Sequence, residues 1–223
     1  MSVTLSEYFC EIPCGETIPF ENPHAVSVSL PEIQNVIDYE EGELQVIDKM
    51  KSGYPRFFQN QFVKQLTQFI KEKYRISDEE KLIPIASIHA KSILESVFNV
   101  ALNCIEDKSK NVFLILDSND ENAKKYADFI RNTGLIISSR KAEATLYELD
   151  LIDSIFEEEY VSKTQAISNI NNTLSNAYGT SSEKIILSNC GMNALFTATE
   201  ALVAVQKEFG KTKVVQLGAD SRP

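Results

Sequence analysis

The sequence predicts a protein of the α/β class, and two observations carry that prediction. Between residues 77 and 155, strand-length apolar runs alternate with segments of helical periodicity. Residues 185–206 then read as a short apolar strand, a turn of small residues and a helix. Because alternating strands and helices form parallel sheets joined by right-handed crossovers, we expect a parallel βαβαβα unit in residues 77–155.

The residues before this unit predict an irregular N-terminal arm followed by helices. Prolines interrupt residues 1–30, although residues 25–30 alternate as an edge strand would. Periodic apolar positions indicate helices over residues 32–39, 46–51 and 62–74. We therefore expect residues 1–76 to form an arm and a helix.

Within residues 77–155 the pattern predicts three strands and three helices. The strands are expected at residues 82–86, 112–116 and 135–138, and the helices at 88–105, 121–132 and 140–154. Gly134 is placed to end the second helix. Residues 82–149 are expected to fold as a unit of their own.

The C-terminal third predicts the beginning of another α/β domain. Residues 156–177 are rich in Glu, Gln and Asn, as a solvated connecting helix would be. A buried strand at 185–187, a helix to Phe209 and a further strand at 213–217 follow.

Composition bounds the partners of the protein. The 223 residues contain 22 Lys and Arg against 32 Asp and Glu, a net charge of −10. This acidic balance argues against nucleic acid or an anionic membrane as the main partner. No apolar run approaches the ~18 residues that span a bilayer, and no secretory signal pattern begins the chain. We expect a soluble, cytoplasmic protein.

The cysteines predict no metal site and no disulfide framework. The four cysteines are Cys10, Cys14, Cys104 and Cys190. The spacing of Cys10 and Cys14 could suggest a metal clip, but no second pair of Cys or His supports it. Only His24 and His89 could add nitrogen ligands. Free thiols in a reducing compartment are the expectation.

The turn at residues 188–191 is a candidate anion site. A strand that passes through a glycine turn into a helix directs unpaired backbone N–H groups and the positive end of the helix dipole to one place. A phosphate binds well there, and Gly191 lets it approach the backbone. The alternative interpretation is an ordinary crossover joint that binds nothing.

A second unusual stretch, GYPRFF, occupies residues 53–58. It sets Tyr54 and Arg56 on either side of a proline of fixed φ. A stretch of this kind is a candidate for a functional role. The alternative for Tyr54 and Arg56 is a surface loop with an ion pair, and the alternative for the two phenylalanines is core packing.

Three runs closely resemble the N-terminal part of fungal cystathionine gamma-synthase-like proteins, which belong to the Cys/Met-metabolism family of pyridoxal-phosphate enzymes. They are PHAVSVSLP at 23–31, YEEGE at 39–43 and DKMKSGYPRFF at 48–58. ISSR at 137–140 is similar to a segment that those proteins insert ahead of the cofactor domain. Cys190-Gly191-Met192 resembles the family's Ser-Gly-Met phosphate turn.

The resemblance implies roles for five residues. The amides of Gly191 and Met192 would hold the phosphate of pyridoxal phosphate, and Cys190 stands where the family usually has Ser. Tyr54 and Arg56 match a Tyr-x-Arg pair that the neighbouring subunit contributes to the same phosphate. The implied assembly is a homo-oligomer or a complex with a full-length paralogue, and the implied substrate is an amino acid.

The resemblance also implies a fold-type I transferase domain that begins at residues 156–223 and is incomplete. The family's Schiff-base lysine, ring-stacking tyrosine and pyridine-binding aspartate lie downstream of the phosphate turn. We therefore expect a fragment of a transsulfuration enzyme of cysteine and methionine metabolism, either a cystathionine gamma-synthase or a C–S lyase, that is inactive alone and has no catalytic residue of its own. The alternatives are a non-catalytic partner of a full-length paralogue and an unrelated small α/β binding domain.

Overall fold

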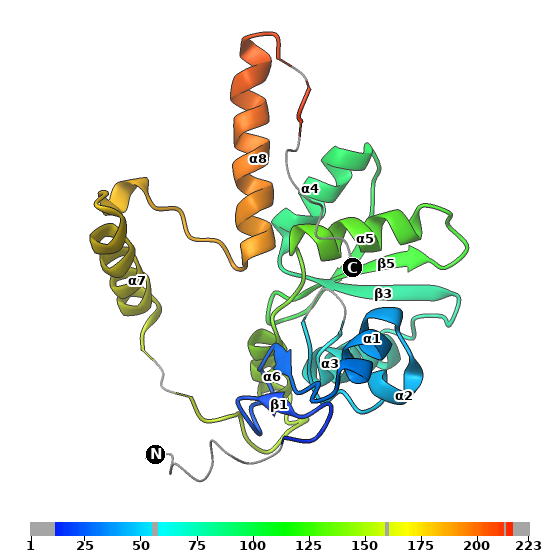
Figure 1. The fold of residues 1–223 in the computed structure, drawn as a ribbon. Coiled ribbons are helices and arrows are strands. Elements are labelled where there is room, and N and C mark those ends of the chain that lie inside the picture. The colour runs from blue at the N-terminus through cyan, green and yellow to red at the C-terminus, as the bar shows by residue number, and fades with distance from the viewer. Residues whose placement is uncertain (1–11, 55–57, 159–160, 212, 216–223) are drawn as a thin grey trace. The chain divides into compact units, whose positions relative to one another are not determined.

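The computed structural model describes residues 12–54, 58–158, 161–211 and 213–215 (Figure 1). The chain divides into two compact units. The first comprises residues 1–155 together with 217–223, and the second comprises residues 156–216. Both units contain helices, and the strands of the described residues lie in the first, so the mixed α/β class is confirmed.

A three-stranded antiparallel sheet forms the centre of the first unit. Its order is β3 (Glu80–Ile85), β5 (Val112–Asp117) and β4 (Asn103–Glu106). Leu82 faces Ile115 across one pair, and Cys104 faces Leu114 across the other. The predicted parallel sheet is therefore wrong, although the strand predictions at 82–86 and 112–116 are confirmed to within two residues.

The hairpin between β4 and β5 explains the antiparallel arrangement. The backbone N–H and the side-chain amide of Asn111 donate to the two carboxylate oxygens of Asp107, at 2.8 and 2.9 Å. Lys110 takes the left-handed conformation, with φ of 59°. A turn of this length returns the chain beside the strand that it has just left, so neighbouring strands run in opposite directions.

The strand β4 lies in residues for which the sequence predicts a helix. Helix α4 (Ile88–Phe98) ends at Asn99, which is left-handed with φ of 51°. A carboxylate oxygen of Glu95 then accepts hydrogen bonds from the Leu102 backbone N–H at 2.9 Å and from the Lys91 ammonium at 2.6 Å. Glu95 thus turns the chain out of the helix, and residues 103–106 extend as β4.

The third predicted strand, at 135–138, is also wrong. These residues form one isolated antiparallel bridge, between Ile136 and Ile85, and the backbone N–H of Ala86 donates to the Leu135 carbonyl at 3.0 Å. Leu135 and Ile137 are nonetheless buried. The apolar run at 135–138 is therefore explained by burial beside the sheet, and it does not form a strand of the sheet.

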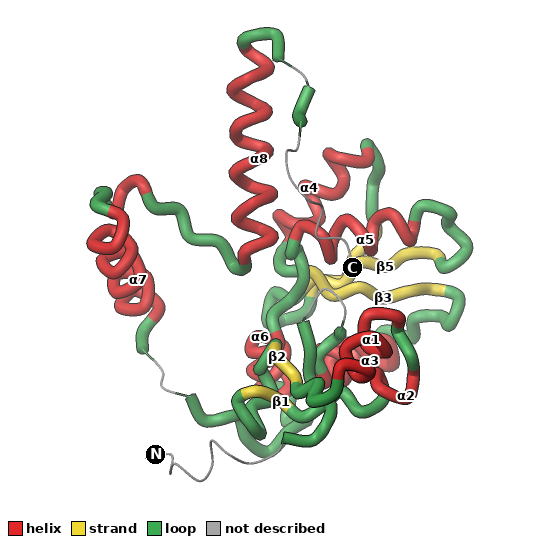
Figure 2. The backbone as a smooth tube through the Cα atoms, in the orientation of Figure 1, coloured by secondary structure: helices red, strands yellow, loops and turns green. Residues whose placement is uncertain are grey.

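Helices cover both faces of the sheet (Figure 2). On one face α4 and α5 (Ala123–Thr133) pack over Val112 and Leu114. On the other face α3 (Gln61–Lys73) and α6 (Ser139–Glu148) pack over Phe113. Since neighbouring residues of a strand point to opposite faces, the side chains of β5 join two hydrophobic cores.

The described part of the N-terminal arm begins at residue 12. Strands β1 (Thr17–Ile18) and β2 (Ser27–Val28) form a two-stranded antiparallel sheet. Helices α1 (Ile33–Glu41) and α2 (Leu44–Ile47) follow. The predictions of an extended segment at 25–30 and of two short helices are confirmed within a few residues.

The second unit consists of α7 (Lys163–Tyr178), the short 3-10 helix η2 (Ser182–Lys184) and α8 (Gly191–Glu208). Neither α7 nor α8 contains a buried residue. The predicted strand at 185–187 is wrong, because these residues are irregular and Ile186 is 84% exposed. Residues 213–215 are not a strand either, and the rest of that predicted strand lies outside the described residues.

A core substitution in α3 tests whether this helix belongs to the same cooperative unit as the sheet. Leu66 is 1% exposed. Leu66→Ala is expected to lower the free energy of unfolding by about 2–5 kcal/mol, because it removes buried methyl groups and leaves a cavity. Urea unfolding measures this, with the exposed Gln68→Ala as a matched control expected to change stability by less than about 0.5 kcal/mol. A small effect of Leu66→Ala would place α3 outside the cooperative unit.

The exit from α4 predicts a pH dependence of stability. The hydrogen bond from the Leu102 N–H, and then that from Lys91, lowers the pKa of Glu95 below its ordinary 4.5. Because the pKa of Glu95 is lower in the folded state, its ionised form adds to the free energy of unfolding above pH 4.5. This stabilisation is lost as the pH falls through the folded-state pKa. The difference in unfolding midpoint between wild type and Glu95→Gln is thus expected to shrink below pH 4.5. A constant difference, like that expected for the exposed Glu121→Gln, would contradict the assignment.

Candidate functional site

The first turn of α8 forms the candidate anion site of the second unit. Cys190 precedes the helix in an extended conformation, with φ of −159° and ψ of 168°. Its carbonyl accepts the first helical hydrogen bond, from the Ala194 N–H at 3.0 Å. The strand expected before this turn is absent, yet the helix begins at Gly191, as the sequence predicts.

The backbone of this turn is accessible. A Cβ atom built on Gly191 would meet no atom within 4 Å. The N–H groups of Gly191 and Met192 lie in the first turn, where an α-helix offers them no carbonyl acceptor. Together with the positive end of an 18-residue helix, they suit an anion. The residues of the turn therefore fit a phosphate group.

Tyr54 lies in the first unit and is 45% exposed. Its carbonyl accepts a hydrogen bond from the Phe58 N–H at 2.9 Å. Gly53 is required beside it, because a Cβ there would come within 2.7 Å of Phe58 Cβ. Arg56 lies outside the described residues. Tyr54 thus belongs to one unit, and Cys190, Gly191 and Met192 belong to the other.

Other kinds of site have little support in the described residues. No group of three His, Cys, Asp or Glu side chains there could hold a metal ion. Within the described residues, Cys14, Cys104 and Cys190 are not joined in disulfide bonds. Among the helices that the structure describes, none combines the length and apolar character needed to cross a bilayer.

The sequence interpretation missed a buried histidine next to the Tyr54 segment. His24 is 5% exposed and lies 2.9 Å from a carboxylate oxygen of Glu143, which is 3% exposed. The signal in the sequence was a histidine within a proline-bounded run of apolar residues and serines. Its partner is 119 residues away, so spacing could not have revealed the pair.

Comparison with known proteins finds relatives that match most of this chain. A cystathionine gamma-synthase of Saccharomyces cerevisiae is 28% identical over 222 residues, which cover 91% of this chain and 34% of that protein. An L-2-amino-4-chloropent-4-enoate dechlorinase/desaturase of Streptantibioticus cattleyicolor is 28% identical over 196 residues, 87% of this chain and 39% of that protein. A putative cystathionine gamma-synthase of S. cerevisiae is 30% identical over 172 residues, 66% of this chain and 26% of that protein.

The chain spans about a third of the length of these curated relatives. No family model matches the chain, and no solved structure does. The resemblance that the arm and turn motifs predicted is nevertheless confirmed by these relatives. The chain is similar, over most of its length, to an N-terminal part of cystathionine gamma-synthase and related proteins.

Proposed function

We propose that this chain is part of a pyridoxal-phosphate protein of the transsulfuration type and contributes phosphate-binding groups to it. The observation that carries the proposal is the open first turn of α8, in a chain whose relatives include cystathionine gamma-synthase. The Cys/Met-metabolism family has pyridoxal phosphate as its cofactor. The start of α8 would then be the start of a fold-type I domain.

The chain offers donors of three kinds for the cofactor phosphate. The amides of Gly191 and Met192 would bind it at the helix end. The Tyr54 hydroxyl and the Arg56 guanidinium would add a neutral and a charged donor, supplied to a neighbouring subunit. Cys190 places a weakly hydrogen-bonding thiol where the family has a hydroxyl, so we assign its side chain a minor part. When bound, the cofactor withdraws electrons from the substrate amino acid.

The names of the relatives indicate a substrate class. One relative is a cystathionine gamma-synthase, and another acts on an amino acid that carries chlorine at carbon 4, which is the γ carbon. We propose that the protein containing this chain acts on α-amino acids with a substituent at the γ carbon, such as an activated homoserine or, in the reverse direction, cystathionine. We propose that it works in cysteine and methionine metabolism.

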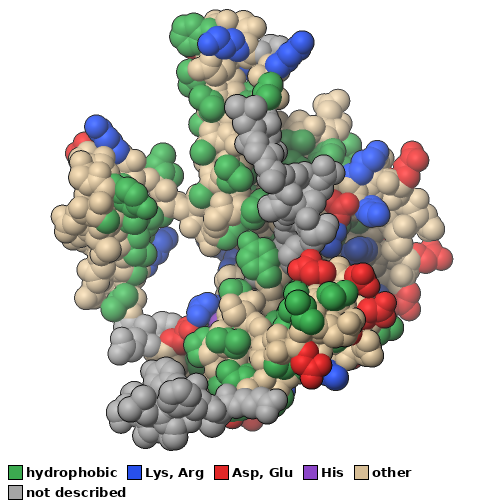
Figure 3. Space-filling model, in the orientation of Figure 1, with side chains coloured by type: hydrophobic (Ala, Val, Ile, Leu, Met, Phe, Trp, Pro, Cys, Tyr) green, Lys and Arg blue, Asp and Glu red, His purple; other side chains and the backbone are tan. Residues whose placement is uncertain are grey.

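Exposed apolar side chains on α8 support a protein partner. Leucine, valine and phenylalanine side chains between 52% and 70% exposed recur along this helix and just after it, at Leu195, Leu202, Val205 and Phe209. Figure 3 shows hydrophobic side chains at the surface of α7 and α8. Surfaces of this kind bury apolar area on association. We propose that they pack in a homo-oligomer or against a full-length paralogue.

Gly191→Ala tests the phosphate site without disturbing the fold. The space around the new methyl group is empty, and alanine favours a helix over glycine by up to ~1 kcal/mol. We expect unchanged or higher thermal stability together with weaker binding of pyridoxal phosphate in equilibrium dialysis. Thr197→Ala, at an exposed position of the same helix, should leave the affinity unchanged. If Gly191→Ala and wild type bind pyridoxal phosphate equally well, the start of α8 does not bind the phosphate.

The positions of the lysines predict that the purified chain does not use the cofactor. Catalysis needs a lysine amine beside the cofactor aldehyde. Lys207 lies at the far end of α8, about 24 Å along the axis from Gly191 at ~1.5 Å per residue. We expect no turnover of homoserine esters or cystathionine, and no lysine labelled selectively after borohydride reduction with pyridoxal phosphate. Peptide mapping measures this, and selective labelling of one lysine would overturn the prediction.

A further inference from the structure

We propose that His24 and Glu143 are positioning residues that hold Tyr54 in place. The proposal rests on the function proposed above in so far as Tyr54 is a phosphate ligand. Neither His24 nor Glu143 belongs to the predicted phosphate-binding set. The pair joins the N-terminal arm to α6, and the residues on either side of His24 hold the segment that carries Tyr54.

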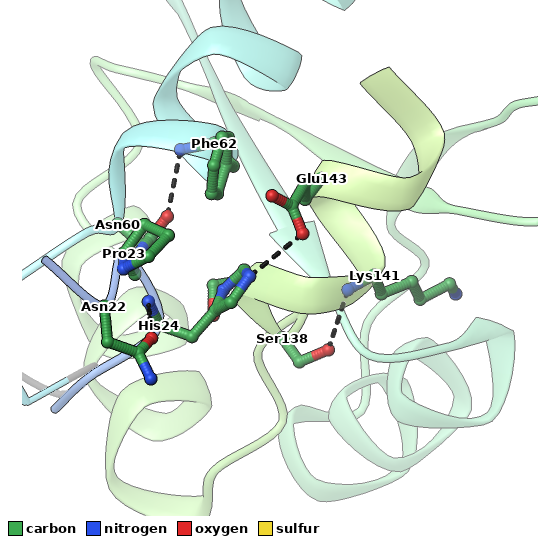
Figure 4. A network of polar contacts seen from close by, with 9 residues as sticks. Asn22, Pro23, His24, Asn60, Phe62, Ser138, Lys141 and Glu143 are labelled. Atoms are coloured by element: carbon green, nitrogen blue, oxygen red, sulfur yellow. Dashed lines mark hydrogen bonds and ion pairs between the residues drawn. The ribbon is translucent and has the colours of Figure 1, made fainter. Parts of the chain in front are cut away.

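The imidazole of His24 is held at both nitrogens, and Figure 4 shows its contact with Glu143. Nε2 lies 2.9 Å from Glu143 Oε2, and Nδ1 lies 2.9 Å from Ser139 Oγ. The ring also packs at 5.5 Å, centroid to centroid, against Phe62 of α3. Since both His24 and Glu143 are at least 95% buried, water competes little for these contacts.

The chemistry of the contacts fixes the ring in one orientation. An ionised carboxylate only accepts hydrogen bonds, so Nε2 carries a proton and donates to Glu143. The Ser139 hydroxyl can rotate, so it donates to a neutral Nδ1 or accepts from a protonated one. The ring therefore has a hydrogen-bonding partner at each nitrogen, as a fixed support requires.

The residues next to His24 hold both flanks of the Tyr54 segment. The Ser52 hydroxyl donates to the carbonyl of Ala25. On the other side, the Asn60 side-chain amide donates to the carbonyl of Pro23 at 2.7 Å. Residues 53–59 therefore start and finish at hydrogen bonds to one tripeptide, whose central side chain is fixed to α6.

Asn60 extends this support into α3. Its side-chain oxygen accepts from the Phe62 N–H at 2.9 Å, which caps the first turn of the helix, while its amide group binds Pro23. Both α3 and α6 pack in the core around Phe113. The segment that carries Tyr54 is thus tied, through His24 and Asn60, to two helices that pack in the core.

Two substitutions of His24 separate its contacts. The amide nitrogen of Gln reaches the position of Nε2, so His24→Gln retains a donor to Glu143, whereas Asn reaches only the position of Nδ1. Leu146→Ala is the control, because Leu146 is fully buried on α6 and makes no part of the pair. It lowers global stability without removing the support of the Tyr54 segment.

Hydrogen exchange of the Phe58 amide, which donates to the Tyr54 carbonyl, reads the segment directly. Measured by NMR and compared with β5 amides, its exchange should accelerate roughly tenfold or more in His24→Asn. His24→Gln should restore most of the protection, and Leu146→Ala should accelerate Phe58 and β5 together. If Phe58 exchange in His24→Asn follows β5 as in the control, the pair is merely structural and the proposal is wrong. Should His24→Asn fail to fold, Ser139→Ala, which removes only the Nδ1 contact, takes its place with a smaller expected acceleration.

Binding of pyridoxal phosphate distinguishes this proposal from the proposed function. Tyr54→Phe and His24→Asn should weaken binding to a similar degree, and His24→Gln should recover it. If Tyr54→Phe binds as wild type while Phe58 exchange still depends on residue 24, the phosphate role of Tyr54 fails and the positioning role stands. If Tyr54→Phe weakens binding while His24→Asn does not, the positioning role is overturned.

Discussion

The packing of β5 on both of its faces is the constraint on which the first unit depends. Phe113 and Leu114 are both fully buried, and they point to opposite sides of the sheet. A strand of this kind cannot be stable until two separate layers of helices cover it, because each fully buried side chain contributes about 1.5–3 kcal/mol only once water is excluded. The layer formed by α3 and α6 is thus as necessary as the layer formed by α4 and α5. For this reason the arm, which reaches α3 and α6, shares in the stability of the sheet.

The second unit has the opposite character. Helices of 16 and 18 residues form without a buried side chain between them. Local features favour them: Ser162 caps α7 by accepting from the Gln165 N–H, and Gly179 ends it in the left-handed conformation. Such features are worth a few kcal/mol at most, so packing of the apolar side chains of α8 must supply the remainder. The exposed apolar side chains of α8 therefore support the protein partner proposed above.

The sequence predicted the positions of helices and strands better than it predicted how they are connected and paired. Apolar periodicity located α3, α5, α8 and the two longer strands, because these elements bury one stripe or one continuous run. It failed at β4, where Glu95 and the left-handed Asn99 end a helix whose apolar pattern continues. It failed again at residues 185–187, since an apolar run becomes a strand only where another strand is available to pair with it. The direction of the strands was also predicted wrongly. It is decided by the short hairpin at Asp107 and not by the apolar runs that form the strands.

In the candidate site too, features set by neighbouring residues could be predicted, and features set by residues far apart in the sequence could not. The helix start at Gly191 follows from a local pattern, and the structure has it there. The support of Tyr54 depends on a pair of residues 119 positions apart, which no spacing rule can reveal.

Such a support has a physical purpose. A phenol that waits in one position loses less conformational entropy on binding a phosphate than one carried on a free loop, and an ordered side chain of this type saves about 0.5–1.5 kcal/mol. The buried His24–Glu143 contact supplies such a reference point within the first unit, and the two hydrogen bonds from Ser52 and Asn60 carry it to the Tyr54 segment.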